Sequence, residues 1–255
     1  MKVSIITAVY NSEKTIEDCA QSIIAQTHPE IEHIVIDGGS TDGTLEILEK
    51  YKEHFAYWVS EKDKGFYDAI NKGLKVATGE LVGTLNADDL YAHNQVIDKV
   101  VNKIKSQAVD SCYGDLVYVH PQDTSKVIRY WKSGDYADGQ FRKGWMPPHP
   151  TFFVRREIYE RYGGFNLEFK ISSDYELLLR FFEKHKISTS YLPEVLVKMR
   201  WGGKSNQNLL NLARKSYEDY KAWQVNELEG DWGIIFMKNF SKIPQFFRKY
   251  ESNLS

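Results

Sequence analysis

The sequence predicts an α/β protein with a mostly parallel central sheet flanked by helices and a helical extension at its C-terminal end. Strand-like and helix-like patterns alternate through the first hundred residues, which is typical of βαβ units. Each strand-like run is followed by polar residues, so polar side chains should gather at one edge of the sheet. After residue 206 the pattern is helical, without internal repeats or low-complexity tracts.

The first half contains strand-like runs with helical patterns between them. Apolar runs bounded by turn residues predict strands over 3–10, 32–37 and 55–61, and a fourth that follows Gly79 and breaks off at two acids. Helical spacing predicts three helices: one with Ile16, Ala20, Ile23 and Ile24 on one face, one carrying Leu45 and Leu48, and one over 66–77. Asn11 and Ser12 offer a cap for the first helix.

From residue 110 onward the pattern changes, and we expect a second half to begin there. It should contain strands over 111–120 and 127–131 joined by a hairpin-like loop, a strand over 151–155, a helix entered at 172–174, and a strand over 195–201. The expected organisation is one domain over 1–205, in parts of about 1–105 and 106–205, and an extension over 206–255.

Size and composition restrict the classes of protein to consider. The 255 residues fit one large α/β domain or two small ones, and a net charge of −2 gives no reason to expect a nucleic-acid partner. Cys19 and Cys112 are too few for a disulfide framework and fit a reducing compartment. No apolar run approaches the roughly 18 residues of a spanning helix, and no signal peptide is evident. We therefore expect a cytoplasmic protein, at most peripheral to a membrane.

Two adjacent acids, Asp88 and Asp89, end the fourth strand-like run. Carboxylates at the carboxyl end of a strand in an open α/β sheet suit a hard divalent cation such as Mg²⁺ or Mn²⁺. Without a cation, a carboxylate and a phosphate about 4 Å apart would repel by about 4 kcal/mol at an effective dielectric constant near 20. These acids predict a metal site that also holds a diphosphate, and the alternative is a solvated loop.

The glycine-rich turn that follows the second strand is a second candidate binding segment. Asp37 ends the strand and could accept a hydrogen bond from a base N–H or a ribose hydroxyl, while the glycines let a ligand approach the backbone. The alternative for Ser40, Thr41 or Asp42 is capping of the next helix. The later run over 62–73 has its own alternative, a solvated charged loop and helix start.

Four motifs in this order resemble those of glycosyltransferase family 2. They are Thr7-Ala8-Val9-Tyr10-Asn11, the turn from Asp37 to Thr44, the pair Asp63-Lys64-Gly65 and Asn71-Lys72-Gly73, and Asn86-Ala87-Asp88-Asp89. The resemblance covers residue 3 to about 205 and implies the Rossmann-like GT-A fold. It also implies a nucleotide-sugar donor, a divalent cation (Mn²⁺ or Mg²⁺) at the acids and inversion at the anomeric carbon. Residues 1–105 would then bind the nucleotide-sugar, and 106–205 the acceptor.

The resemblance also assigns roles to residues of the motifs. Asp37 matches the family acid that contacts the nucleoside, and Asp88 and Asp89 match the donor and metal acids. The donor-binding residues implied in this way are Thr7, Tyr10, Asn11, Asp37, Gly38, Asp63, Lys64, Asp68, Asn86 and Asp88. The chain departs from the family pattern twice: the strand-two turn has Gly38 where a second acid is usual, and the metal motif is not a strict Asp-x-Asp.

The family's general base is an acid at the start of a later helix, which matches Asp174, with Ser173 in the place of the usual preceding acid. A positioned carboxylate can take the proton of a sugar hydroxyl in the transition state. The alternative is that Asp174 caps its helix. Glu176 is a reserve candidate that could hold the acceptor instead.

Three further residues have a functional and a structural interpretation. His149 lies in a proline-rich turn and is either structural or a contact to the acceptor or a metal. Arg200 or Lys204 could pair with a phosphate, or the segment could be an ordinary strand end followed by a flexible turn.

The tail combines apolar residues at helical spacing with basic residues. The apolar set is Trp232, Ile235, Phe236, Phe240, Ile243, Phe246 and Phe247, and the basic set is Lys238, Lys242, Arg248 and Lys249. Residues 232–250 could lie in an anionic membrane interface, or pack on the catalytic domain or a partner subunit. Pro244 would interrupt such a helix.

These observations together predict an inverting, metal-dependent transfer of a hexose from a nucleoside-diphosphate sugar, with a UDP-sugar favoured. The expected acceptor is a hydroxyl of a glycan or lipid-linked oligosaccharide in polysaccharide biosynthesis. The alternatives are a sugar nucleotidyltransferase, and a catalytically silent subunit that binds nucleotide-sugar. The first strand-helix turn lacks a glycine-rich, Lys/Arg-bearing signature for a triphosphate, which argues against the nucleotidyltransferase.

Overall fold

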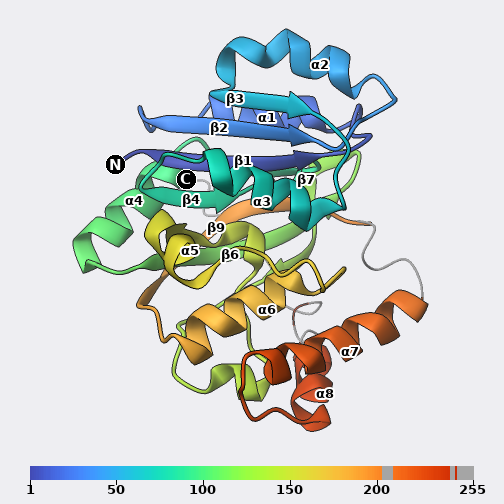
Figure 1. Ribbon diagram of the computed structural model, residues 1–255. Coiled ribbons are helices and arrows are strands. Elements are labelled where there is room, and N and C mark those ends of the chain that lie inside the picture. The colour runs from blue at the N-terminus through green and yellow to red at the C-terminus, as the bar shows by residue number, and fades with distance from the viewer. Residues whose placement is uncertain (203–208, 242–244, 246–255) are drawn as a thin grey trace.

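A single sheet with helices on both faces organises the protein (Figure 1). The computed structural model describes residues 1–202, 209–241 and 245. Over these residues the sheet has nine strands in the order β3-β2-β1-β4-β8-β6-β9-β5, with β7 paired to β6. The predicted α/β class is confirmed.

The sheet is parallel in the first half of the chain and mixed in the second. Strands β1 (Val3–Val9), β2 (Ile31–Asp37), β3 (Tyr57–Ser60) and β4 (Leu81–Thr84) pair in parallel. The other strands are β5 (Asp89–Tyr91), β6 (Ser111–His120), β7 (Asp123–Trp131), β8 (Phe153–Arg155) and β9 (Thr189–Arg200). Their pairings are antiparallel except for that of β6 with β9. The expected parallel arrangement therefore holds for the first half.

Eight α-helices are present in the described residues. They are α1 (Ile16–Ile24), α2 (Thr44–Tyr51), α3 (Phe66–Val76), α4 (Val96–Gln107), α5 (Arg156–Tyr162), α6 (Ser173–Leu179), α7 (Leu209–Val225) and α8 (Trp232–Phe240). Short turns of other helix types add η1 (Lys52–His54), η2 (Gln140–Lys143), η3 (His149–Thr151) and the π-type segment η4 (Arg180–Lys184) that continues α6.

Several element boundaries differ from those predicted. Strand β4 ends at Thr84, and Asp89 opens the separate strand β5, so the acid pair lies between two strands. Strand β9 begins at Thr189, well before the predicted start. On α1, Ile24 is 38% exposed, whereas Cys19 is fully buried and completes the apolar face. The helical spacing was therefore recognised correctly, but one member of the face was wrong.

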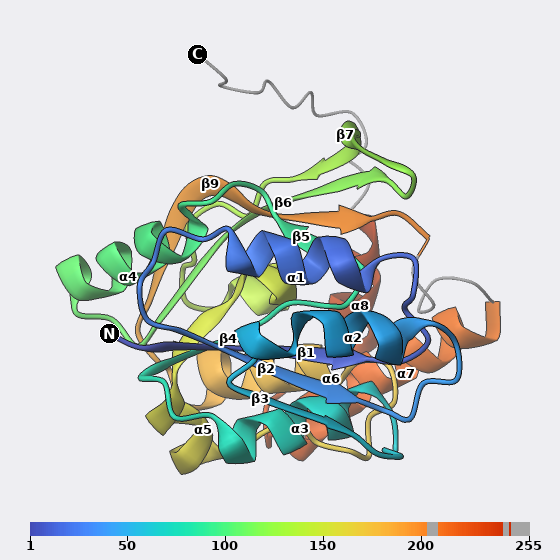
Figure 2. The same ribbon diagram turned by 90° about the horizontal axis from the view of Figure 1, so that it is seen from above.

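Helices lie on both faces of the sheet (Figure 2), and a hydrophobic cluster fills the space between the sheet and the helices on each face. Along β1, Ile5 packs with α1, α2 and α4, and the next residue, Ile6, packs with α3, α5 and α6 on the opposite face. Helix α3 lies very close to the sheet because a Cβ at Gly73 would come within 2.4 Å of the Ile6 side chain. This glycine therefore sets the position of the helix that follows the 62–65 loop.

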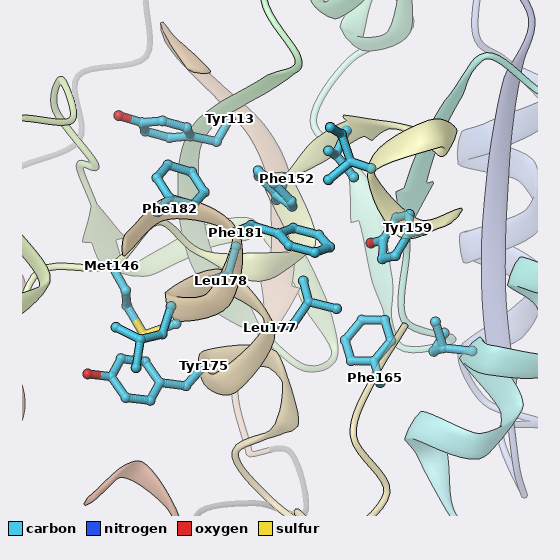
Figure 3. Packing of buried hydrophobic residues seen from close by; sticks show 14 of the residues in the cluster. Tyr113, Met146, Phe152, Tyr159, Phe165, Tyr175, Leu177, Leu178, Phe181 and Phe182 are labelled. Atoms are coloured by element: carbon cyan, nitrogen blue, oxygen red, sulfur yellow. The ribbon is translucent and has the colours of Figure 1, made fainter. Parts of the chain in front are cut away.

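Aromatic residues form much of the core beneath the second half. Tyr113, Phe152, Phe181 and Phe182 lie around α6 and η4 (Figure 3), and the Phe152 and Phe182 ring centroids are 5.7 Å apart. These aromatic side chains therefore pack α6 against the sheet.

The C-terminal helices pack on the second half of the fold. Helix α7 lies along α6, and α8 lies beside α7 and η2 (Figure 1). Lys238 is only 1% exposed and pairs with Asp219 at 2.7 Å, so it does not belong to a basic outer face. Trp232, Phe236 and Phe240 are more than half exposed. Ile235 is buried in the core at 2% exposure. The remaining tail residues named above, Ile243, Phe246, Phe247, Lys242, Arg248, Lys249 and Pro244, lie outside the described residues.

Among the helices that the structure describes, none has the length and apolar character needed to cross a bilayer.

Candidate active site

The carboxyl ends of β1, β2 and β3 bring three of the predicted motifs to one edge of the sheet. The ladder pairs Val9 with Asp37, and Asp37 with Ser60. The loops that follow these strands therefore begin side by side, as expected for parallel strands.

Asp37 is fully buried and organises these loops. Its carboxylate accepts hydrogen bonds from the backbone N–H groups of Gly39 (3.0 Å) and Ser40 (2.9 Å) and from the hydroxyls of Ser40 and Ser60. The Ser40 hydroxyl in turn accepts the Asn11 N–H at 2.8 Å. The Asn11 side chain accepts the Thr41 N–H at 2.9 Å, with Asn11 in a left-handed conformation (φ 48°). Asp37 and Asn11 thus hold the two loops together.

The neighbouring motif residues divide between the surface and the interior. Tyr10 is 51% exposed at the end of β1, whereas Thr7 is fully buried and its hydroxyl lies 3.0 Å from His33 Nε2. Asp42 accepts the N–H of Thr44 at the start of α2. Gly43 is the N-cap residue of α2 and no side-chain capping bond is made there, so Asp42 stabilises the turn before the helix but does not cap it. Thr7 belongs to the interior beneath the edge.

Asp63 lies in the space that a second acid at position 38 would occupy. A Cβ at Gly38 would be 2.5 Å from Asp63 Oδ2, so the absence of a side chain there makes room for this carboxylate. The other oxygen, Oδ1, accepts the Gly65 N–H at 2.8 Å, and Asp68 accepts the Lys64 N–H at 3.0 Å. The loop before α3 is thereby fixed with Asp63 against the strand-two turn.

Asp89 and Asp88 differ sharply in environment. Asp89 is fully buried; its Oδ2 accepts the Asn86 side-chain N–H at 2.6 Å, and Oδ1 has no hydrogen bond of good geometry among the described residues. Burial, and then the charge of Asp88, raise the pKa of Asp89, whereas the Asn86 side chain and the Arg200 backbone N–H oppose this effect. Asp88 is partly exposed. A buried carboxylate with so few hydrogen bonds is one that a cation would stabilise.

Arg200 ties the acid loop to the rest of the fold. Its guanidinium donates to the Asp88 carbonyl at 2.8 Å and to the Pro121 carbonyl at 3.1 Å, and it pairs with Asp18. These contacts hold the backbone of Asp88 in place. A phosphate bound by Arg200, as predicted, would contact a guanidinium that already makes these three interactions. Lys204 lies outside the described residues.

The donor set fits a divalent ion that completes its coordination on a substrate. No group of three or more ligating side chains, His149 included, is gathered closely enough for a metal in the part of the chain that the structure describes. Mg²⁺ commonly uses one or two carboxylates plus substrate phosphates. Asp88 and Asp89 supply such a pair. Cys19 is buried nearby, and burial raises the pKa of its thiol, which therefore stays protonated.

Asp174 lies at the N-terminal end of α6 and is partly exposed. Its Oδ1 accepts the Tyr175 N–H at 2.8 Å and lies 3.3 Å from the Tyr67 hydroxyl. That hydroxyl also lies 2.8 Å from the Ile171 carbonyl, and the Tyr67 ring stacks on Phe165. Tyr67 therefore connects α3, in the first half of the chain, with the candidate base. Tyr67 lies within the 62–73 run, but no role was predicted for it from the sequence.

Glu176 faces away from this edge. It is 3% exposed, pairs with Arg180 at 3.1 Å and accepts the Asn226 side-chain N–H at 3.1 Å. Burial raises its pKa. These contacts favour Asp174 over Glu176 as the base or as a contact to the acceptor.

His149 is a buried neighbour of the same region. It is 7% exposed, and its ring meets the Phe165 ring edge-on at 5.3 Å. Burial lowers its pKa, and the charge of Asp174 opposes this effect. His149 is therefore a neutral imidazole near the candidate base.

Tyr118 lies within electrostatic range of acids from both halves of the chain. Burial raises the pKa of Tyr118; Arg129 opposes this effect, and both Asp89 and Asp174 add to it. The Arg129 guanidinium lies 4.7 Å from the Tyr118 ring centre. Both acids thus act electrostatically on one phenol from different elements. Nothing in the sequence distinguished Tyr118 from an ordinary strand residue.

Comparison with solved structures supports the fold assignment. S. aureus TarS 1–349 in complex with UDP-GlcNAc gives a TM-score of 0.70 at 21% identity, over 92% of this chain and 69% of that one. The mannosyltransferase PcManGT from Pyrobaculum calidifontis, solved with GDP-Man and Mn²⁺, gives 0.66 at 20% identity, over 96% and 73%. Against another TarS structure the chain spans 45% of the TarS chain. The fold is thus that of GT-A glycosyltransferases.

Sequence comparison identifies the family. An uncharacterized glycosyltransferase of Mycobacterium tuberculosis (strain ATCC 25618 / H37Rv) is 32% identical over 194 residues, 70% of this chain and 68% of the relative. A PGL/p-HBAD biosynthesis glycosyltransferase of Mycobacterium bovis (strain BCG / Pasteur 1173P2) is 29% identical over 208 residues, 80% and 78% of the two chains. The family model of Glycosyl transferase family 2 matches residues 4–163. The chain therefore belongs to glycosyltransferase family 2 and is an enzyme that transfers sugars.

Proposed function

We propose that the enzyme is an inverting, metal-dependent hexosyltransferase that uses a nucleoside-diphosphate sugar, with a UDP-sugar favoured. The acceptor is a hydroxyl of a glycan or lipid-linked oligosaccharide in polysaccharide biosynthesis, at the cytoplasmic membrane face. The observation that carries this proposal is the contact between Tyr67, on the helix that follows the 62–65 loop, and Asp174, because it joins the loops at the sheet edge to the candidate base. The nucleotide-sugars in the TarS and PcManGT structures support the donor class.

Asp63 and Tyr10 are the proposed nucleoside contacts. The Asp37 carboxylate already accepts several hydrogen bonds from the loops around it. Its proposed role is therefore to shape the turn, in preference to a direct contact with the nucleoside. Asp63 Oδ2 lies against Gly38 at the same edge and can accept a hydrogen bond from a base N–H or a ribose hydroxyl. Tyr10 follows Val9, which pairs with Asp37 in the sheet, and its ring is exposed at the same edge.

Asp88 and Asp89 would hold the divalent cation together with the donor diphosphate. When bound, the ion supplies Lewis-acid stabilisation of the departing nucleoside diphosphate. Asn86 and Arg200 keep these acids in place through the Asp89 carboxylate and the Asp88 carbonyl. The chain therefore provides a fixed pair of carboxylates of which one is accessible.

Asp174 is the proposed general base. A sugar hydroxyl is a weak nucleophile at neutral pH, and a carboxylate within hydrogen-bond reach can accept its proton as the bond to the anomeric carbon forms. Tyr67 contacts Oδ1 of Asp174, and Oδ2 has no hydrogen bond among the described residues, which leaves it for the acceptor hydroxyl. Attack from the side opposite the leaving diphosphate would invert the anomeric carbon.

The test is turnover with a panel of UDP- and GDP-sugars, with and without Mn²⁺ or Mg²⁺, and with added chelator. We expect release of nucleoside diphosphate that depends on the metal, and an Asp174→Asn variant that binds donor normally but turns over about 10² to 10⁴ times more slowly. Release of pyrophosphate would instead indicate a nucleotidyltransferase. Donor binding without transfer by the wild type, across the acceptor panel, would indicate a silent subunit.

The exposed side chains of α8 support a proposed contact with a membrane or with another subunit. Trp232, Phe236 and Phe240 are 54%, 64% and 51% exposed, although Lys238 is withdrawn into the interior. Co-sedimentation with anionic vesicles separates the alternatives, because a Phe236→Ser variant should lose vesicle binding only if α8 meets lipid.

A further inference from the structure

We propose, on the basis of the function given above, that the C-terminal extension is a positioning element of the transferase. Glu218 on α7 holds the segment 170–172 so that Asp174 faces the acceptor. Helix α7 lies directly along α6 in the fold (Figure 1).

Glu218 binds three consecutive backbone amides just before α6. Its Oε1 accepts the Lys170 N–H at 3.1 Å, and its Oε2 accepts the Ile171 and Ser172 N–H groups at 2.8 and 3.0 Å. The side chain is 6% exposed, and Arg214 donates to Oε1 at 3.0 Å. Burial raises the pKa of Glu218, but these N–H groups outweigh burial and lower it, so the carboxylate stays ionised.

This carboxylate holds the backbone that leads into α6. Ser172 occupies the N-cap position of α6 without a side-chain capping bond. Glu218, on a helix more than forty residues later in the chain, accepts the N–H of Ser172 and those of the two residues before it. Because a charged acceptor forms stronger hydrogen bonds than a neutral one, the segment is held firmly.

The same segment fixes the surroundings of the candidate base. Glu218 binds the N–H of Ile171, and the carbonyl of the same residue lies 2.8 Å from the Tyr67 hydroxyl. Tyr67 also lies 3.3 Å from Asp174 Oδ1. A shift of the segment would therefore move both Asp174 and the tyrosine that orients it.

The extension also binds the residues that follow Asp174. Trp223 donates to the Tyr175 hydroxyl at 3.0 Å, and Asn226 donates to Glu176 at 3.1 Å. From α8, the Lys238 ammonium lies 3.3 Å from the centre of the Tyr175 ring. The extension thus holds the chain on both sides of Asp174, at 170–172 and at 175–176, while the Asp174 carboxylate lies beside the Tyr67 hydroxyl of α3.

The experiment uses Glu218→Gln in the full chain, with Glu168→Gln as the matched control. Glu168 pairs with Lys221 of the same helix at 2.9 Å and is exposed, but it binds none of the three amides. The measurements are amide hydrogen exchange at 170–172, kcat, and the KM for the donor. A displacement of about 1 Å can cost roughly 100-fold in rate, so we expect a fall in kcat of about 10- to 100-fold.

The expected result for Glu218→Gln is faster exchange at the three amides and a lower kcat at an unchanged donor KM, while Glu168→Gln resembles the wild type. Glu218→Asp keeps the charge and should recover part of the kcat; it replaces Glu218→Gln if the latter does not fold. Unchanged exchange, unchanged kcat, or a parallel loss of donor binding would each overturn the proposal. If Asp174→Asn keeps full turnover, the proposed function fails, whereas the exchange measurement still tests the hold of Glu218 on the segment.

Discussion

Moving an acid from position 63 to position 38 should preserve donor binding, whereas removing it should not. The two positions compete for one volume, since a Cβ at Gly38 would lie 2.5 Å from Asp63 Oδ2. Gly38 has no left-handed backbone conformation that would exclude a side chain. The variants are Asp63→Ala, Gly38→Asp and the double variant.

The structure sets the sizes of the expected effects. A hydrogen bond to a charged group contributes about 1.5 to 3 kcal/mol, so Asp63→Ala should weaken donor binding by roughly 10- to 150-fold. Gly38→Asp alone places two carboxylates in contact, which costs about 4 kcal/mol at a separation near 4 Å and an effective dielectric constant near 20. In the double variant the clash disappears and an acid again lies at the strand-two turn, so most of the affinity should return.

Calorimetric titration of each variant with nucleoside diphosphate and Mn²⁺ measures these affinities, and thermal denaturation checks the fold. The test is whether the change in binding free energy of the double variant differs from the sum of the changes in the two single variants. If Asp63→Ala binds like the wild type, or if the double variant binds no better than the worse single variant, Asp63 does not contact the nucleoside.

Three further predictions concern the base, the core and the sheet. Tyr67→Phe should reduce kcat about 10-fold without changing the donor KM, because it removes only the hydroxyl beside Asp174; an unchanged kcat in steady-state assays would count against that contact. Lys238→Met leaves Asp219 buried without a partner and should lower the free energy of unfolding by about 3 to 5 kcal/mol in denaturant titrations, with recovery when Asp219 is replaced by Leu as well. Burial raises the pKa of Glu32, but hydrogen bonds from Lys2, Ser4 and Thr78 outweigh it and lower the pKa to about 2. Since the folded-state pKa is depressed, this stability is present above the ordinary value near 4.5 and disappears as the pH falls through 2. Glu32→Gln should therefore cost about 3 kcal/mol at pH 7 and little near pH 2, and an equal loss at both would contradict the assignment.

The sequence carried most of the information about the first half of the fold. The parallel strands and helices there obey local rules of period and turn chemistry, and β2 and α3 lie almost where the patterns placed them. Boundaries failed where distant pairing decides them. Asp89 opens a strand because it pairs with Met199, and no local pattern around residue 89 contains that partner.

In the candidate site, too, the residues set in local motifs were predicted, and the contacts between distant segments were not. The motifs indicated Asp88, Asp89 and Asp174, each recognisable from its immediate neighbours. The motifs could not indicate that Asp63 fills the space left at Gly38, because the contact joins two separate loops. Glu218 was missed for a similar reason: a glutamate in a helical pattern looks like a solvated residue until the helix is placed beside 170–172.

The pairing of β5 with β9 has a consequence for how the enzyme is made. The backbone at Asp89 is fixed by Met199, and the Asp88 carbonyl by Arg200. A ribosome must therefore produce about two hundred residues before the acid loop finds its supports, and contacts so distant along the chain form slowly. A fragment ending near residue 105 would carry every nucleotide motif and yet lack the architecture that aims its acids.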